Sequence, residues 1–199
     1  MANPPFNLFD VLLATVLVGG FIHGRKHGLS GELLSTAKWL TLLLLCAASY
    51  RLAGNLIADT GLFDVLTCYL FAYLGIALVV FLLYSILERR WGPKLVGTDI
   101  FGRSEYFLGT GFGVLRFVSM LFVGLALLNA RQFSPSELRN IEKYQEENYG
   151  SHIFPGLHSL QAAVFERSLT GAFIRDNLGF LLIEPTTANE QQVAQARPH

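Results

Sequence analysis

Apolar residues gather into four long segments in the first two thirds of the chain. These segments cover about residues 6–22, 33–52, 65–87 and 108–130. The third segment runs from Val65 to Leu87 without a single charged side chain. A helix of this length is about 34 Å long, whereas the hydrocarbon of a bilayer is roughly 30 Å thick. Because a helix of a soluble domain would carry a polar face over that distance, this segment predicts a membrane-spanning helix.

Each of the other three segments has an ionisable residue inside its apolar run, which is Asp10 in the first, Lys38 in the second and Arg116 in the fourth. Arg51 lies next to the end of the second segment. Each segment is long enough to cross a bilayer if its ionisable group snorkels to the surface or is paired inside a bundle. The pattern predicts an all-α integral membrane bundle of about four transmembrane helices. As an alternative, the first or second segment forms an interfacial or re-entrant helix, because its purely apolar stretch is short.

The chain becomes more polar after residue 130. Six of its 15 Lys and Arg residues and eight of its 15 Asp and Glu residues lie beyond this point. We therefore predict a membrane domain over residues 1–130, an amphipathic helical tail over 131–185 and a disordered C-terminus over 186–199. Composition excludes a disordered polyelectrolyte, since 52% of the residues are hydrophobic and only 15% are charged. The net charge of zero gives no basic surplus for nucleic acid.

The tail carries signals for short helices. Ser134 to Glu137 form a capping box with proline at the first helical position, which predicts that a helix begins there. A second helix is predicted over residues 155–167, followed by a break at Gly171. The apolar patch at residues 178–183 is too short to cross a bilayer. We expect it to dock on the membrane surface or on the bundle.

Basic residues predict the orientation of the bundle. The first and third connections are rich in them, whereas the second offers Arg51 beside two aspartates. The basic residues of the two rich connections are Arg25, Lys26 and Lys38, and Arg89, Arg90, Lys94 and Arg103. By the positive-inside rule these connections are cytoplasmic, which places the N-terminus, the middle connection and the tail on the periplasmic side. Three basic residues after the last segment argue the other way: Arg131, Arg139 and Lys143.

Two sets of glycines recur at four-residue spacing. The first is Gly20, Gly24 and Gly28, and the second is Gly109 and Gly113. In lipid, small residues at this spacing let two helix backbones approach closely. We expect them to pack helices of one chain together, with self-association of two chains as the alternative.

Glu32 and Arg116 are placed near the same leaflet by this topology, at the start of the second segment and about two turns into the fourth. A guanidinium at that depth needs a partner, so the two groups are predicted to pair. In the alternative, Arg116 snorkels to lipid headgroups and Glu32 only caps its helix. Asp10 lies at the opposite end of the first segment and is predicted to be a solvated acid at a helix start.

Signals for catalysis, metal binding or a cofactor are weak. The five histidines show no metal spacing such as HExxH, and no GxSxG motif is present. Cys46 and Cys68 lie inside apolar segments, where packing is the expected role of a thiol. The glycines from Gly109 to Gly113 lack the preceding strand and following lysine of a phosphate loop. We therefore predict a non-enzymatic protein without catalytic, metal-binding or cofactor-binding residues.

Two motifs resemble the colicin V production protein family of bacterial inner-membrane proteins. The first is an early Asp10 followed by residues 27–35 (HGLSGELLS) and Trp39. The second is Gly97-Thr98-Asp99 followed by residues 108–116 (LGTGFGVLR). The resemblance covers roughly residues 6–130. His27 stands where the family has arginine, Phe117 stands where it has glycine, and residues 100–107 form an insertion.

This resemblance implies a multi-pass protein needed for production or export of a peptide toxin, or for envelope homeostasis. Two functions are compatible with it. In the first, a non-enzymatic accessory protein docks on other inner-membrane or export proteins. In the second, a small oligomeric channel or transporter subunit lines a pathway with Glu32, Arg116 and Asp99. We favour the first, because no internal repeat or pair of broken helices is visible. Expected partners are the lipid bilayer, export proteins and other copies of the chain, but not nucleic acid.

Overall fold

Three long helices and a small helical tail make up the part of the chain that the computed structural model describes, which is residues 7–96, 104–131, 133 and 157–186. The long helices are α1 (Leu8–Ala58), α2 (Val65–Val96) and α3 (Ser104–Asn129). The tail contains α5 (Leu157–Phe165), α6 (Leu169–Leu178) and the 3₁₀ helix η1 (Gly179–Leu181). Within the described ranges, β-pairing is limited to one isolated bridge between Arg131 and Thr186.

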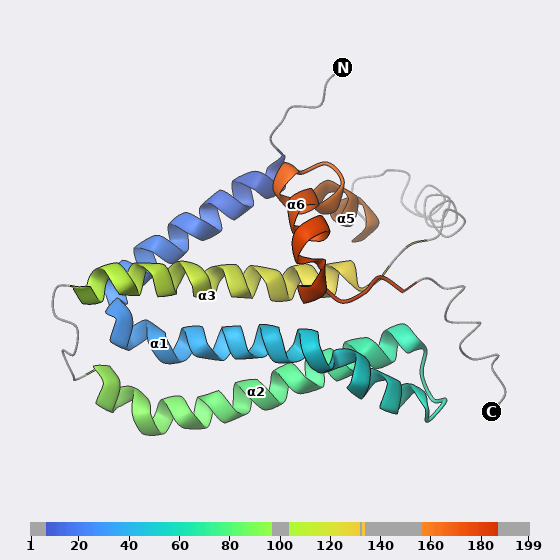
Figure 1. The fold of residues 1–199 in the computed structure, drawn as a ribbon, viewed down its shortest axis with the longest axis horizontal. Helices are drawn as coiled ribbons and strands as arrows, with labels where there is room; N and C mark the ends of the chain where they lie inside the picture. Colours follow the sequence, from blue (N-terminus) through green and yellow to red (C-terminus); the bar gives the residue numbers. More distant parts are fainter. Residues whose placement is uncertain (1–6, 97–103, 132, 134–156, 187–199) are drawn as a thin grey trace, which may run out of the picture.

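A sharp kink at Gly28 divides α1 into two arms, residues 8–27 and 29–58. Gly28 has φ 69° and ψ 177°, a conformation open to glycine because it has no Cβ atom. Figure 1 shows the chain doubling back at this point. The sequence prediction of two separate helices joined by a loop after residue 22 is therefore corrected. One residue makes the turn, and helix continues on both sides of it.

The second arm of α1 lies between α2 and α3, and the first arm crosses α3 (Figure 1). The core contains Leu42, Cys46 and Tyr50 of α1, Tyr73 of α2 and Phe122 of α3. Cys46 Sγ donates a hydrogen bond to the carbonyl oxygen of Tyr73 at 3.5 Å. Both cysteines are free and buried, so the packing role predicted for them is confirmed.

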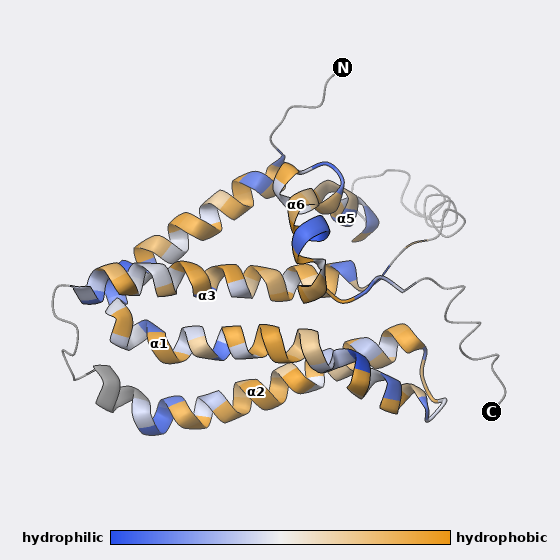
Figure 2. Ribbon diagram, viewed as in Figure 1, coloured by the Kyte–Doolittle hydropathy of each residue, from blue (hydrophilic) through white to orange (hydrophobic). Residues whose placement is uncertain are grey.

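The long helices keep large apolar side chains on their outer faces. On α2, Leu74, Leu78 and Leu82 are each more than half exposed. Figure 2 shows mostly hydrophobic residues along the long helices and hydrophilic residues toward their ends and on the tail. All three helices are long and apolar enough to cross a membrane. Each arm of α1 also reaches about 30 Å or more at 1.5 Å per residue, the thickness of bilayer hydrocarbon.

The tail docks on the bundle, one of the two docking surfaces expected from the sequence. Glu184 forms an ion pair of 2.8 Å with Arg51 of α1, and the side chain of Asn129 on α3 donates to the carbonyl oxygen of Ile183 at 2.9 Å. Leu182 and Ile183, from the predicted apolar patch, are buried in the core. The tail therefore ties the end of α3 to the second arm of α1.

Asp10 also anchors the tail, so its prediction as a merely solvated acid is corrected. It does begin a helix, because it completes a capping box with Asn7. Its Oδ1 also accepts hydrogen bonds from the Ser168 hydroxyl, at 2.8 Å, and from the Thr170 hydroxyl. The side chain of Asn7 donates to the carbonyl oxygen of Ala163 at 2.6 Å. The start of α1 thus holds α5 and α6.

The break predicted at Gly171 lies instead before α6. Ser168 caps that helix by accepting from the Gly171 amide at 3.1 Å, and Gly171 is inside the helix. A Cβ at this position would collide with the carbonyl oxygen of Val164, so the glycine permits close packing of α6 on α5. The helix predicted from Ser134 and the disordered end predicted after residue 186 lie outside the described residues.

Candidate functional site

The candidate site is built by glycines that bring α3 against the kinked α1. A Cβ added to Gly20 would lie 2.8 Å from Val114 Cα, and one added to Gly109 would lie 2.6 Å from Gly28 Cα. A Cβ added to Gly113 would lie 2.6 Å from Gly24 Cα. Real Cβ atoms do not approach backbone this closely, so the first arm of α1 and α3 meet backbone to backbone. The glycines pack helices within one chain, which was the first of the two alternatives.

The kink folds the start of the second arm back toward this contact. The break at Gly28 frees backbone amides that a continuous helix would satisfy. Glu105 at the start of α3 lies against Gly28, and its Oε1 accepts from the Ser30 amide at 3.4 Å. One turn of helix after the kink, Glu32 faces the interior between the first arm and α3.

Glu32 is the centre of a charged cluster and is only 1% exposed. Its Oε2 lies 3.1 Å from Arg116 Nη1 of α3, and its Oε1 lies 3.1 Å from His23 Nε2 of the first arm. His27 Nδ1 is 3.8 Å from the same Oε1. A carboxylate removed from water needs such partners, because an unpaired buried charge is strongly unfavourable. Of the two alternatives predicted for Glu32 and Arg116, an ion pair or separate roles, the structure shows the ion pair.

Arg116 connects this cluster to the bundle interior. Its side chain is 24% exposed, and its Nε is buried without a hydrogen-bond partner among the described residues. Four residues after Glu32, the Thr36 hydroxyl donates to the carbonyl oxygen of Phe112 at 3.0 Å. The ion pair of Glu32 with Arg116 and the hydrogen bond of Thr36, about one helical turn apart, therefore fasten the second arm of α1 to α3, in addition to the contact of Ser30 with Glu105.

Two histidines form the outer wall of the cluster. The rings of His23 and His27 lie 4.2 Å apart, and their side chains are 38% and 52% exposed. His27 Nδ1 is also 3.0 Å from the carbonyl oxygen of His23. One ligand atom from each histidine and from Glu32 all lie within 4.8 Å of one another, so these three residues could hold a metal ion. The i, i+4 spacing of the histidines was the available signal, and a search restricted to HExxH overlooks it.

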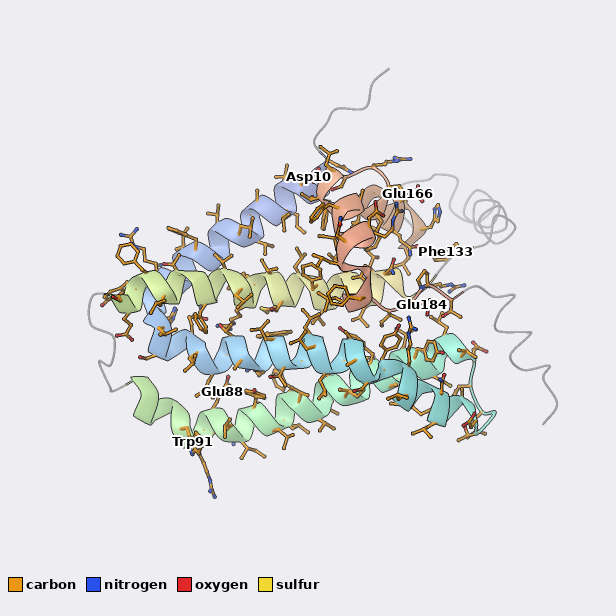
Figure 3. All side chains as sticks on the ribbon, in the orientation of Figure 1. Asp10, Glu88, Trp91, Phe133, Glu166 and Glu184 are labelled. Atoms are coloured by element: carbon orange, nitrogen blue, oxygen red, sulfur yellow. The ribbon has the colours of Figure 1, made fainter. Side chains whose placement is uncertain are left out.

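A second ion pair lies between α1 and α2. Lys38 Nζ is 3.0 Å from Glu88 Oε1, and the Ser35 hydroxyl donates to the same oxygen at 3.2 Å. Lys38 Nζ also lies 5.0 Å from the ring centre of Phe81. Figure 3 places Glu88 on the side of α2 that faces α1. Sequence reasoning allowed Lys38 a partner but did not find Glu88, because nothing in the chain fixes the register of the two helices.

The structure thus gathers most of the residues singled out from the sequence at one end of the bundle. Glu32, Arg116 and His27 meet in the charged cluster, beside the glycine contacts. His23 joins them without having been predicted. Asp99 lies outside the described residues.

One comparison with known proteins places the chain in a family. The model of the colicin V production protein family matches residues 9–147, which is more than half of the chain. The chain belongs to the colicin V production protein family. No curated protein and no solved structure gave a match. Together with its three long apolar helices, membership in this family makes the chain a membrane protein.

The family match contains the whole charged cluster and its glycine contacts, and it extends past α3 toward the tail. His27 is one of the two histidines beside Glu32. Its imidazole is a side chain that can bind a metal ion, whereas the arginine that the resemblance of the sequence motifs implies at this position could not.

Proposed function

We propose that this chain is a non-enzymatic accessory protein of the bacterial inner membrane, which assists production or export of a colicin V-like toxin or, more generally, envelope homeostasis. Membership in the colicin V production protein family supports a role in toxin production. The accessory role rests on the way ionisable side chains pair with one another inside the bundle.

The observation that carries this proposal is the pairing of ionisable groups inside the bundle. Glu32 is 1% exposed and bound to Arg116, and Lys38 is 8% exposed and bound to Glu88. Ionisable groups that line a transport pathway face a water-filled cavity. These groups face one another across helices of the same chain, as expected if their role is to hold the bundle together.

The exposed basic residues offer a docking surface at the kinked end of the bundle. Arg25 and Lys26 are exposed next to the kink, and Arg89 and Arg90 are exposed near the end of α2. Trp91 follows them and is 56% exposed (Figure 3). Arginine and tryptophan are the residue types that dominate binding energy in protein interfaces. We propose that this surface binds an inner-membrane or export protein.

The test is chemical cross-linking of the tagged full chain in its native membrane, followed by purification and identification of what accompanies it. We expect one other membrane protein at near one-to-one ratio. Its recovery should fall in the Arg89→Ala, Arg90→Ala double variant and stay unchanged in Arg175→Ala, where an exposed arginine of the tail is removed. Recovery of self-copies alone would overturn the accessory role.

A thiol-reactive scan of α3 separates the accessory role from a channel or transporter subunit. Single cysteines are placed along α3 in a chain without Cys46 and Cys68 and treated with a membrane-impermeant reagent. The accessory role predicts labelling only near the helix ends, because the middle of α3 faces lipid or protein. A continuous labelled stripe on one face would indicate a water-filled pathway and would contradict the proposal.

A further inference from the structure

We propose that His23, His27 and Glu32 bind one divalent transition-metal ion of the zinc class across the kink of α1. Imidazole nitrogens and a carboxylate oxygen are the ligands that zinc takes in sites with three protein ligands and an open fourth position. The proposal goes beyond the accessory role and does not depend on it.

The distances fit a site that closes when the His27 ring gives up the contact of its Nδ1 with the carbonyl oxygen of His23, 3.0 Å away, and the side chains move together. Glu32 Oε1 lies 3.1 Å from His23 Nε2 and 3.8 Å from His27 Nδ1, and the three ligand atoms all lie within 4.8 Å of one another. Bonds of about 2.0–2.1 Å in a tetrahedron place ligand atoms roughly 3.3 Å apart. His23 and His27 are one turn apart on the same face of the first arm, so their rings reach the same point without a change in the backbone.

Arg116 prepares the carboxylate for this role. It binds Oε2 of Glu32 at 3.1 Å and leaves Oε1 directed at the histidines. A partner that fixes the orientation of a ligand in this way raises the affinity of a metal site. The positive charge of Arg116 opposes that of the ion, so we expect weaker binding than in a closed structural zinc site.

The exposure of the histidines gives the ion an entrance. Their side chains are 38% and 52% exposed, whereas Glu32 is buried beneath them. An ion bound here has protein ligands on its inner side and room for water on its outer side.

A bound ion would join the two arms of α1. His23 and His27 precede the kink at Gly28, and Glu32 follows it. Two ligands on one arm and one on the other fix the angle between the arms. Because a ligand that binds only the folded state stabilises it, metal binding should raise the thermal stability of the bundle.

The experiment uses the full chain in detergent, purified through a tag without histidines and stripped with a chelator. It is dialysed against zinc chloride in the presence of excess magnesium, and the bound zinc per chain is measured. We expect one zinc ion per wild-type chain. His23→Ala and His27→Ala should each lower the affinity at least tenfold, and the double variant should lose the bound zinc.

His158→Ala is the matched control, because it removes a partly exposed histidine of α5 that lies against Phe133. This variant should keep the zinc of the wild type. Thermal unfolding provides a second measurement: zinc should raise the midpoint of the wild type and of His158→Ala but not that of the double variant. Without zinc, His158→Ala should unfold at the temperature of the wild type, whereas His23→Ala and the double variant lose a partner of buried Glu32 and should unfold at a lower one. The effect of zinc on each variant is therefore measured against that variant's own zinc-free midpoint.

Two results would overturn the site. The first is a wild-type chain that binds no zinc above the magnesium background. The second is equal zinc content in the wild type and in the double variant, which would show that the ion binds elsewhere. If the double variant fails to fold, His27→Gln alone decides the question, because glutamine keeps a polar side chain but lacks a ring nitrogen for the metal.

Discussion

At the scale of single residues, Glu32 draws its partners from the opposite side of the kink and from another helix. Arg116 comes from α3 and His23 from the first arm of α1, each at 3.1 Å. Because Glu32 is almost completely buried, losing one of these partners leaves charge that water cannot compensate. The cluster therefore stabilises the bundle only when all of its charged groups are present.

We expect Arg116→Ala and Glu32→Gln to lower the amount of folded protein in the membrane. Removing one partner of a buried ion pair typically destabilises a protein by about 3–5 kcal/mol. Thermal unfolding in detergent and the protein level in isolated membranes measure the effect. Arg175→Ala is the control, because Arg175 is exposed and pairs only with Asp176 among the described residues. Exposed ion pairs of this kind contribute about 0–1 kcal/mol to stability. Wild-type behaviour of both cluster variants would dismiss the pair.

The sequence permits part of this cluster to be predicted. Charges at membrane depth demand partners, and Glu32 and Arg116 were close enough along the membrane normal to be paired in advance. His23 could not be assigned in the same way, because its contact depends on the fold of the kink. Lys38 and Glu88 show the same limit, since their contact depends on the register of α2 against α1.

At the scale of elements, the contact between the first arm of α1 and α3 depends on which glycines face it. Gly109 and Gly113 lie against α1, whereas a Cβ added to Gly111, two residues from each, would meet nothing within 4 Å. The three glycines belong to the same turns of one helix and differ in the direction they face. Alanine substitutions at the three positions therefore separate an effect of packing from an effect of helix propensity.

We expect Gly109→Ala and Gly113→Ala to destabilise the bundle by roughly 1–3 kcal/mol, the usual cost of overpacking. Gly111→Ala should be neutral or stabilising by up to about 1 kcal/mol, because alanine favours helix and meets open space. Thermal unfolding of the three variants in the same detergent tests this. Equal effects at all three positions would show that the close contact with α1 is not what selects glycine.

Glycine spacing alone predicts that helices approach closely, but not the kink. Gly28 continues the four-residue repeat and is thereby assigned to packing, whereas its positive φ also makes it the turning point of α1. A tight turn by a single residue and a loop of several residues follow the same hydrophobic pattern. For this reason the apolar segments are located correctly from the sequence and the connection between the first two is not.

At the scale of the whole molecule, polar contacts between the elements gather at the two ends of the bundle. The kink, Glu105 and the pair of Lys38 with Glu88 lie at one end. At the other end, Asp10 binds α6 and Arg51 binds Glu184. This arrangement agrees with an even number of crossings, in which the start of α1 and the tail share one side of the membrane.

The side on which the tail lies is the last prediction. The exposed Arg25, Lys26, Arg89 and Arg90 all belong to the kinked end, and basic residues are retained in the cytoplasm. We therefore expect the tail to be periplasmic. A C-terminal alkaline phosphatase fusion should be active and a C-terminal green fluorescent protein fusion dark, whereas fusions truncated after Trp91 should show the reverse. A fluorescent full-length fusion would place the tail in the cytoplasm and invert the assignment. Because Asp10 and Ser168 are in contact, the N-terminus would then have to move to the cytoplasm with it.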